Sequence, residues 1–235
     1  MAYAFVNQTS ATSTANVSNL ALPSYTPVAG NTLLLPFYWG NGSVVTISLS
    51  DGGAGNTYLP LFTQVQTGGS SFWGFYAQNV AGVATVITAT SSSSTAKCGF
   101  YLGEYSGIFQ LLGSNAVEKN GPGSGANTCT SGLFATGGTP VMVWGFNFNA
   151  SGDTASSAGT SPIAFTGQTP VWAPLGAGGT TTCALGEDAA YAGATQTIAS
   201  TFGPSNQFDS YYTAGASFAE SNTYLYDTAT VAWLT

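Results

Sequence analysis

A pattern of alternating residues between positions 31 and 58 constrains the fold of this chain more than any other feature. Residues 44–50 read VVTISLS, so apolar side chains alternate with hydroxyl side chains after the first valine. A period of two is typical of a β-strand with one buried and one exposed face. The apolar run at 31–39 predicts a strand before it. The glycine-rich segment at 51–58 predicts a hairpin loop, because its residues tolerate the positive φ angles of tight turns.

Segments of the same kind recur along the whole chain, and no segment has a convincing helical period of about 3.6 residues. Besides the stretch above, strands are expected at residues 3–8, 17–22, 58–66, 71–78, 84–90, 97–105, 140–149, 171–175, 183–191, 195–202 and 228–235. Residues 67–70 predict a second hairpin, and loops are expected at 91–95, 113–128, 150–161 and 203–216. About a dozen strands at this spacing predict one all-β domain over residues 1–235, a two-sheet antiparallel β-sandwich of the jelly-roll type.

The expected strand at 97–105 has side chains of different kinds on its two faces. One face carries Cys98, Phe100, Leu102 and Glu104, and the other carries Tyr101 and Tyr105. We expect Cys98 to be a buried free thiol. Glu104 stands on an apolar face, which leaves two interpretations: a carboxylate hydrogen-bonded to a neighbouring loop, or a residue of a functional site.

The charge balance excludes several classes of partner. Only 5% of the residues are charged, against roughly 25% in an average soluble domain. The two basic residues, Lys97 and Lys119, cannot neutralise a run of phosphates, and the net charge is −7. We therefore expect no nucleic-acid partner. No apolar stretch reaches about 18 residues, so no insertion into a membrane is expected.

The N-terminus lacks a basic region followed by an apolar run, so it does not resemble a signal peptide. Either a signal has been removed, or the protein leaves the cell without one, as virion components do on lysis. We favour the second explanation, because a plausible strand begins directly after Met1. A chain that is rich in neutral polar residues fits a virion surface or another extracellular location.

The catalytic groups of common enzymes are scarce. The chain has no histidine, which removes the Ser-His-Asp and Cys-His arrangements and zinc sites that need imidazole. Its nine carboxylates always allow some pair, so they do not by themselves indicate a glycosidase. We expect a protein that is not an enzyme and that needs no cofactor, with calcium as the one possibility.

Two loops could supply oxygen ligands to calcium. Asp51 and Asn56 lie in the glycine-rich segment, and loop ends of sandwich proteins often hold such an ion. A plain turn is the alternative, because no further acids accompany them at this spacing. Glu187, Asp188 and Asp227 form a second candidate of the same kind.

Cys129 and Cys183 could form a disulfide, although the sequence cannot establish that they approach each other. Exposed aromatic residues could stack on sugar rings. Trp172, Tyr211 and Tyr212 lie nearest to expected loops and are the candidates for such a ligand site. Core positions are expected for the other tryptophans, which are Trp39, Trp73, Trp144 and Trp233.

Short segments in the first half of the chain suggest a relationship. In order they are FVNQ at 5–8, PVAGNTLL at 27–34, the loop at 51–58, WGFYAQNVAG at 73–82 and EYSG at 104–107. This order resembles the jelly-roll modules of bacterial surface proteins and of structural proteins of tailed phages. The resemblance covers residues 3–110, mostly turn and core positions. It implies a β-sandwich in a structural role and provides no catalytic motif.

Two functions remain open. The first is a non-enzymatic structural protein of an extracellular assembly, such as a capsid decoration, head fibre or tail protein of a virion, or a filament subunit. Its partners would be copies of itself or other surface proteins, since low charge removes repulsion between packed copies and sheet edges can be shared. The alternative is a glycan-binding adhesion module, which the jelly-roll architecture and the aromatic residues favour.

Overall fold

The structure is a computed structural model, and all regular elements in its described part are β-strands in antiparallel pairs. It describes residues 3–13, 15–40, 45–67, 70–95, 98–120, 127–136, 141–149, 155–157, 182–191, 195–196, 199–202 and 210–220. The prediction of an all-β fold of antiparallel sheets that pack against each other is confirmed. No helix in these residues has the length and hydropathy to cross a membrane.

Three sheets make up most of the described structure. The central sheet has the order β1-β8-β3-β6-β5, with β1 Ala4–Ser13, β8 Cys98–Ser106, β3 Thr32–Trp39, β6 Ser70–Ala77 and β5 Leu59–Thr67. The first outer sheet has the order β2-β7-β4, with β2 Val17–Ala21, β7 Thr88–Thr95 and β4 Ile47–Ser50. The second outer sheet has the order β14-β12-β17-β9, with β14 Thr182–Tyr191, β12 Val141–Asn149, β17 Ser210–Glu220 and β9 Ile108–Asn120.

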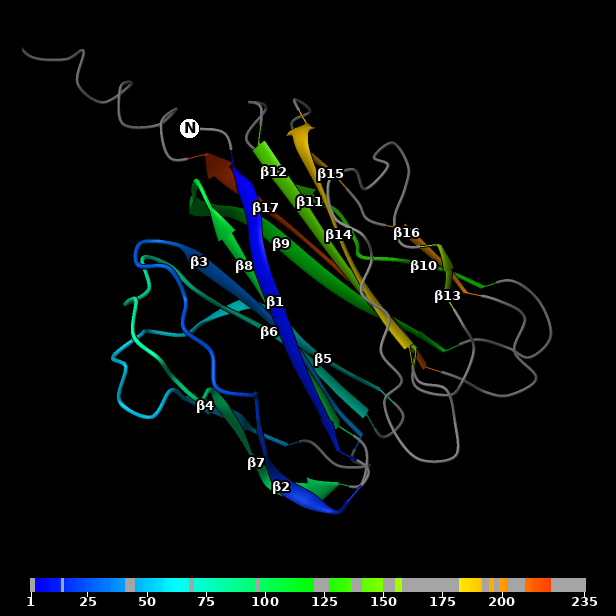
Figure 1. Ribbon diagram of the computed structural model, residues 1–235. Helices are drawn as coiled ribbons and strands as arrows, with labels where there is room; N and C mark the ends of the chain where they lie inside the picture. Colours follow the sequence, from blue (N-terminus) through cyan, green and yellow to red (C-terminus); the bar gives the residue numbers. More distant parts are fainter. Residues whose placement is uncertain are drawn as a thin grey trace, which may run out of the picture.

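Five short strands form two further small sheets. One has the order β10-β16-β13, with β10 Asn127–Thr130, β16 Ala199–Phe202 and β13 Ala155–Ser157. The other pairs β11 Phe134–Ala135 with β15 Thr195–Gln196. In Figure 1 the first outer sheet lies at the bottom of the view, and β12, β14 and β17 lie toward the top.

The middle strands of the central sheet, β3 and β8, are buried on both faces. Leu33, Leu35 and Phe37 of β3 pack into a core that contains Ala89 of the first outer sheet. Leu34 and Tyr38 alternate with them and join a second core with residues of the second outer sheet, which are Met142, Trp144, Ala214, Ala216 and Phe218. A strand that is buried on both faces needs apolar residues at consecutive positions, which explains the apolar run at 31–39.

Strand β8 confirms the predicted division of its two faces. Phe100 and Leu102 lie in the core below the first outer sheet, and Tyr101 and Tyr105 lie in the core below the second. The predicted hairpin at 67–70 is also confirmed, because β5 and β6 pair antiparallel with Thr67 opposite Ser70.

The loop at 51–58 is not a hairpin, contrary to the sequence prediction. It follows β4, which belongs to the first outer sheet, and leads to β5, which belongs to the central sheet. The segment therefore crosses from one layer to another. A period of two identifies the residues that share a face but not the sheet in which the strand lies, so the alternation at 44–50 could not reveal this crossing.

Two segments predicted as loops contain strand. Residues 91–95 belong to β7, where Ser91 and Thr95 are buried while Thr90 and Ser92 are exposed, so the period of two is carried by hydroxyl residues alone. In the segment 113–128, residues up to Asn120 belong to β9 and residues from 127 belong to β10.

The prediction of loops also fails at residues 155–157, which are β13, and at 210–216, which are part of β17. Residues 113–117 of β9 pair with residues 213–217 of β17, largely through small residues. Glycine, serine and asparagine are frequent in turns, so composition alone pointed to a loop here. The expected strands at 171–175 and 228–235, and Trp233, lie outside the described residues.

Candidate functional site

The candidate site is a surface hollow at one end of the central sheet, where three segments meet. Its volume is about 570 Å³, within the range of about 300–1,000 Å³ that is usual for ligand pockets. We call it the end hollow. It is lined by Gly30, Gln78, Asn79, Ile108, Phe109 and Gln110.

The strand ends place these residues together. Gly30 precedes β3, and Gln78 and Asn79 follow β6 directly. Gly107 separates β8 from β9 and has a φ of 75°, which lets the chain leave the central sheet and enter the second outer sheet within one residue. Ile108, Phe109 and Gln110 therefore begin β9 next to the ends of β3 and β6.

The end hollow combines an apolar surface with carboxamides. Ile108 is buried, whereas Phe109 is 55% exposed. The Gln78 side chain donates a hydrogen bond from Nε2 to the Phe109 carbonyl oxygen, so this amide is held beside the aromatic residue. Gln110 is exposed. The residues that line the end hollow carry no formal charge.

Asn79 has an unusual backbone conformation. Its φ is 51°, and it is the one non-glycine residue with a positive φ in the described part of the chain. Asparagine tolerates this region better than most residues, yet the conformation still costs free energy relative to ordinary backbone. Such outliers gather at ligand sites and tight turns, so the backbone of Asn79 favours a ligand site at this end of the sheet.

A buried carboxylate supports the loop that carries Gly30. Glu104 on β8 is 1% exposed. Its Oε1 accepts hydrogen bonds from the Val28 backbone N–H at 2.8 Å and from the Asn31 Nδ2 at 2.6 Å. Its Oε2 accepts a hydrogen bond from the Tyr25 hydroxyl. The interpretation of Glu104 as a carboxylate hydrogen-bonded to a neighbouring loop is confirmed.

Tyr25, the tyrosine of this hydrogen-bond network, has a raised pKa. Burial and then the hydrogen bond to Glu104 raise the pKa of Tyr25 above its ordinary value. The Tyr25 hydroxyl therefore keeps its proton and remains a donor at neutral pH. On the same edge, the Thr32 hydroxyl donates to the Ile108 carbonyl oxygen at 3.2 Å, which joins the start of β3 to the start of β9.

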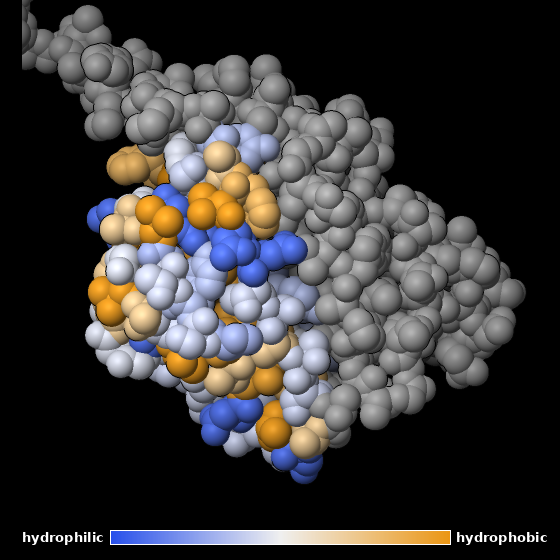
Figure 2. Space-filling view, in the orientation of Figure 1, coloured by the Kyte–Doolittle hydropathy of each residue, from blue (hydrophilic) through white to orange (hydrophobic). Residues whose placement is uncertain are grey.

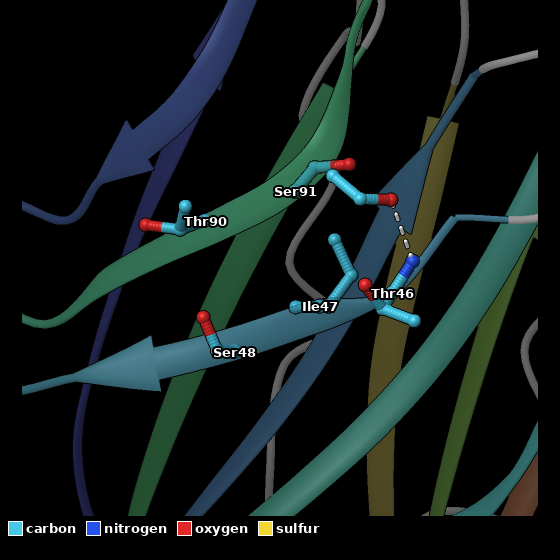
Figure 3. Close-up of a pocket in the computed structure, with 6 residues that line it drawn as sticks. Thr46, Ile47, Ser48, Thr90 and Ser91 are labelled. Carbon is cyan, nitrogen blue, oxygen red and sulfur yellow. Dashed lines mark hydrogen bonds between the residues drawn. The ribbon is translucent and has the colours of Figure 1, made fainter.

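A second hollow lies over the first outer sheet and is lined by hydroxyl side chains. Its volume is about 290 Å³, and it is lined by Thr46, Ile47, Ser48, Thr90, Ser91 and Ser92. Figure 3 shows Ser48 and Thr90 on neighbouring strands and the hydrogen bond from the Thr46 N–H to the Ser92 hydroxyl, which measures 3.0 Å. This hollow offers hydroxyl groups but no aromatic surface, so the end hollow has the more varied chemistry.

The structure brings Asp51 and Asn56 together in the loop between β4 and β5. The Asp51 carboxylate accepts backbone hydrogen bonds from Gly53 at 3.3 Å and from Asn56 at 2.9 Å. The Asn56 side-chain oxygen accepts one from the Ala81 N–H at 2.8 Å. Calcium at this loop stays a prediction, and an ion would have to share oxygens that already stabilise the loop. Burial and the charge of Asp51 raise the pKa of Tyr58 to about 12.

Metal-ligating residues are sparse in the structure. Within the described residues, no three His, Cys, Asp or Glu side chains gather into a group that could hold a metal ion. Of the second calcium candidate, Glu187 and Asp188 lie on β14, opposite Trp144 and Val143 of β12, and Asp227 lies outside the described residues.

The predicted aromatic ligand site is only partly covered by the structure. Trp172 lies outside the described residues. Tyr211 and Tyr212 lie on β17, where their backbones pair with Lys119 and Glu118 of β9, so they stand in a strand and not in a loop as expected. Three of the tryptophans expected in the core are buried, namely Trp39, Trp73 and Trp144.

The cysteines have different outcomes. Cys98 is a buried free thiol as predicted, and burial raises its pKa from 9.0 to about 12. Cys129 lies on β10 opposite Ser200, and Cys183 lies on β14 opposite Phe148, so their strands belong to different sheets. Their side chains are outside the described part of the chain, and the disulfide stays a prediction.

The sequence did not single out the end hollow. Gly30, Gln78 and Asn79 lie within the segments that carry the resemblance, and Phe109 and Gln110 lie outside every segment with a predicted role. The available signal was Gly107 directly after a strand and before an apolar pair, which marks a turn with an aromatic residue beside it. Comparisons with protein-family models, with curated proteins and with solved structures found no match to this chain.

Proposed function

We propose that this chain is a non-enzymatic structural protein of an extracellular assembly, most simply a subunit of a virion surface or of a filament. Its partners would be copies of itself or other surface proteins. The proposal rests on the edge strand β1, which contains no charged residue and no proline.

Apart from a bulge near its start, strand β1 lacks the features that protect sheet edges from pairing with other chains. It forms one edge of the central sheet and pairs with β8 on its other side. Its ten residues, AFVNQTSATS, include neither a charged residue nor a proline. Natural proteins usually protect exposed edges with charges, prolines or bulges, because an unprotected edge can accept a strand from another molecule.

The other edges of the two larger sheets provide a contrast. In the described structure, β5 contains Pro60, β14 contains Glu187 and Asp188, and β9 contains Glu118 and Lys119. Among the edges of these two sheets, this distribution leaves β1 as the one best suited to pairing. The edges of the first outer sheet, β2 and β4, are also uncharged but are only five and four residues long, against ten in β1. The bulge between Phe5 and Asn7 affects only its first residues, so residues 7–13 keep a regular register with β8.

The surface is also compatible with packing between copies. Several large apolar side chains are exposed, namely Val6, Val28, Leu59, Val83, Val86, Phe109 and Leu133. Figure 2 shows apolar residues interspersed with polar residues on one face of the molecule. Scattered apolar residues are common on monomers, so this observation supports the proposal only together with the edge.

The test is the oligomeric mass of the purified protein, measured by sedimentation velocity, together with electron microscopy of native material. We expect a defined oligomer or a lattice, and Thr12→Lys on β1 should raise its dissociation constant by about tenfold or more. Thr90→Lys is the matched control, because Thr90 is also exposed but lies on β7, the middle strand of its sheet. A wild-type protein that stays monomeric and binds glycans on an array contradicts the assembly proposal.

Glycan binding is the second candidate function. The end hollow favours it, because this hollow places an exposed aromatic residue beside carboxamide side chains. The two functions are compatible in one surface protein, but each is supported by different residues.

A further inference from the structure

We propose that the end hollow is a binding site for a neutral saccharide. The inference rests on the second function proposed above and gives it a location on Phe109, Gln110, Gln78 and Asn79. It does not involve Trp172, Tyr211 or Tyr212, and it does not depend on the assembly through β1.

The first step is the aromatic surface. Of the large hydrophobic side chains that are exposed in the described residues, Phe109 is the one with an aromatic ring. The C–H groups of a pyranose ring carry partial positive charge and pack against the electron-rich face of such a ring. Ile108 lies buried beneath the same hollow and extends its apolar floor.

The second step is the hydrogen-bonding inventory around this surface. Gln78, Asn79 and Gln110 each carry a carboxamide, which offers both donors and acceptors. A sugar hydroxyl is itself a donor and an acceptor, so carboxamides match it without a change of protonation. The hydrogen bond from Gln78 to the Phe109 backbone carbonyl oxygen holds one of these amides at the residue that carries the ring.

The third step is the charge of the site. No lining residue is charged, and the carboxylate of Glu104, which holds the supporting loop, is 1% exposed and accepts three hydrogen bonds from the protein. A sialylated or sulfated sugar would find no cation among the lining residues, and the net charge of −7 would repel it. The chemistry therefore favours neutral hexoses and N-acetylhexosamines.

The fourth step is the rigidity of the frame. The loop that carries Gly30 is tied to β8 through Val28 and Asn31, and its Gly30 N–H donates to the Val80 carbonyl oxygen at 3.0 Å. The Val80 N–H donates in turn to the Asn31 carbonyl oxygen at 3.1 Å. A site that is held before the ligand arrives loses less conformational entropy on binding. The positive φ of Asn79 is maintained in this frame at a local cost.

The experiment begins with the intact protein on a printed array. The array carries neutral oligosaccharides of glucose, galactose, mannose and N-acetylglucosamine, together with sialylated and sulfated oligosaccharides. The neutral oligosaccharides that bind are then titrated in solution, with saturation-transfer NMR to detect contact with the protein. We expect binding to neutral oligosaccharides, and we expect the sialylated and sulfated ones to bind more weakly.

The variants locate the site. Phe109→Ala should weaken binding by about tenfold or more, and Phe109→Trp should preserve it. Leu133→Ala is the matched control, since Leu133 is 62% exposed and does not line the end hollow. Asn79→Gly removes the carboxamide but allows the same backbone conformation, so it should weaken binding without lowering the melting temperature.

Each outcome decides the proposal. Loss of binding in Phe109→Ala with retention in Leu133→Ala and an unchanged melting temperature supports it. Binding that is equal in the wild type, Phe109→Ala, Gln110→Ala and Asn79→Gly overturns the location while glycan binding stands. A folded wild-type protein that binds none of the oligosaccharides overturns both the site and the glycan-binding function. A preference for the acidic oligosaccharides overturns the neutral class of ligand.

Discussion

Replacing Tyr25 with phenylalanine tests the buried network that holds the loop before β3. The substitution removes one hydroxyl and keeps the ring, which is 9% exposed and belongs to the core between the central sheet and the first outer sheet. The Glu104 Oε2 then loses the hydrogen bond from Tyr25, while Oε1 keeps those from Val28 and Asn31.

The magnitude follows from the burial of the carboxylate. A hydrogen bond to a charged group contributes about 1.5–3 kcal/mol to stability. A buried oxygen that loses its partner has given up its hydration without a hydrogen bond to compensate, which lowers stability further. Because Glu104 is 1% exposed, water cannot readily replace the hydroxyl. We therefore expect Tyr25→Phe to lower the free energy of unfolding by about 2 kcal/mol.

The assay is unfolding in urea followed by tryptophan fluorescence. With a slope of about 2 kcal/mol/M, the midpoint should fall by about 1 M at an unchanged slope. Tyr76→Phe is the control, because Tyr76 is only partly buried and contacts Phe218 through its ring. We expect a change within about 0.5 kcal/mol for this control.

A double-mutant cycle with Glu104→Gln separates the hydrogen bond from general effects on the loop. If the Tyr25 hydroxyl acts through Glu104, the two changes should show a coupling energy of about 1 kcal/mol or more. Equal midpoints for Tyr25→Phe and Tyr76→Phe, or additive effects of Tyr25→Phe and Glu104→Gln, would refute the role assigned to this hydrogen bond.

Three further predictions concern other parts of the fold. A Cβ at Gly74 would overlap the Phe62 ring, so Gly74→Ala should lower the free energy of unfolding by about 1–3 kcal/mol in urea unfolding, and adding Phe62→Leu should restore part of the loss. The raised pKa of Cys98 means that only the unfolded chain loses this proton at alkaline pH. The contribution of this group to the free energy of unfolding should therefore be complete below about pH 9. It should fall by up to about 1.4 kcal/mol per pH unit as the pH rises toward about 12. Cys98→Ala should make the free energy of unfolding depend less steeply on pH in this range. Asp51→Ala should cost about 1–2 kcal/mol in thermal melts, through the backbone hydrogen bonds that it loses. If calcium raises the melting temperature of the wild type but not of Asp51→Ala, that result supports the calcium prediction.

The strands with strong side-chain patterns could be predicted from the sequence. The apolar run at 31–39 predicts β3 correctly. The two faces of β8 are also predicted correctly, because a period of two separates Phe100 and Leu102 from Tyr101 and Tyr105. The hairpin between β5 and β6 was predictable because turn residues separate two strands of similar length. In each case the information is local.

The parts that failed depend on contacts between distant segments. The last residues of β7 are hydroxyl residues, and the middle of β9 at 113–116 consists of small residues. These stretches become strand through pairing with β4, β2 or β17. The end hollow was missed for the same reason, since Gly30, Asn79 and Phe109 are far apart in the sequence. Neither propensity nor periodicity indicates which strand ends lie side by side.

The burial of the middle strands of the central sheet on both faces has a consequence for cooperativity. Strands β3, β6 and β8 supply side chains to both cores, with Leu35, Trp73 and Phe100 in one and Leu34, Phe72 and Tyr101 in the other. If one core opens, the strands that order the other core lose their positions. The two cores are therefore coupled and should melt in one transition. Trp39 and Trp73 lie in one core and Trp144 lies in the other, so each core contains its own fluorescent reporter for this coupling.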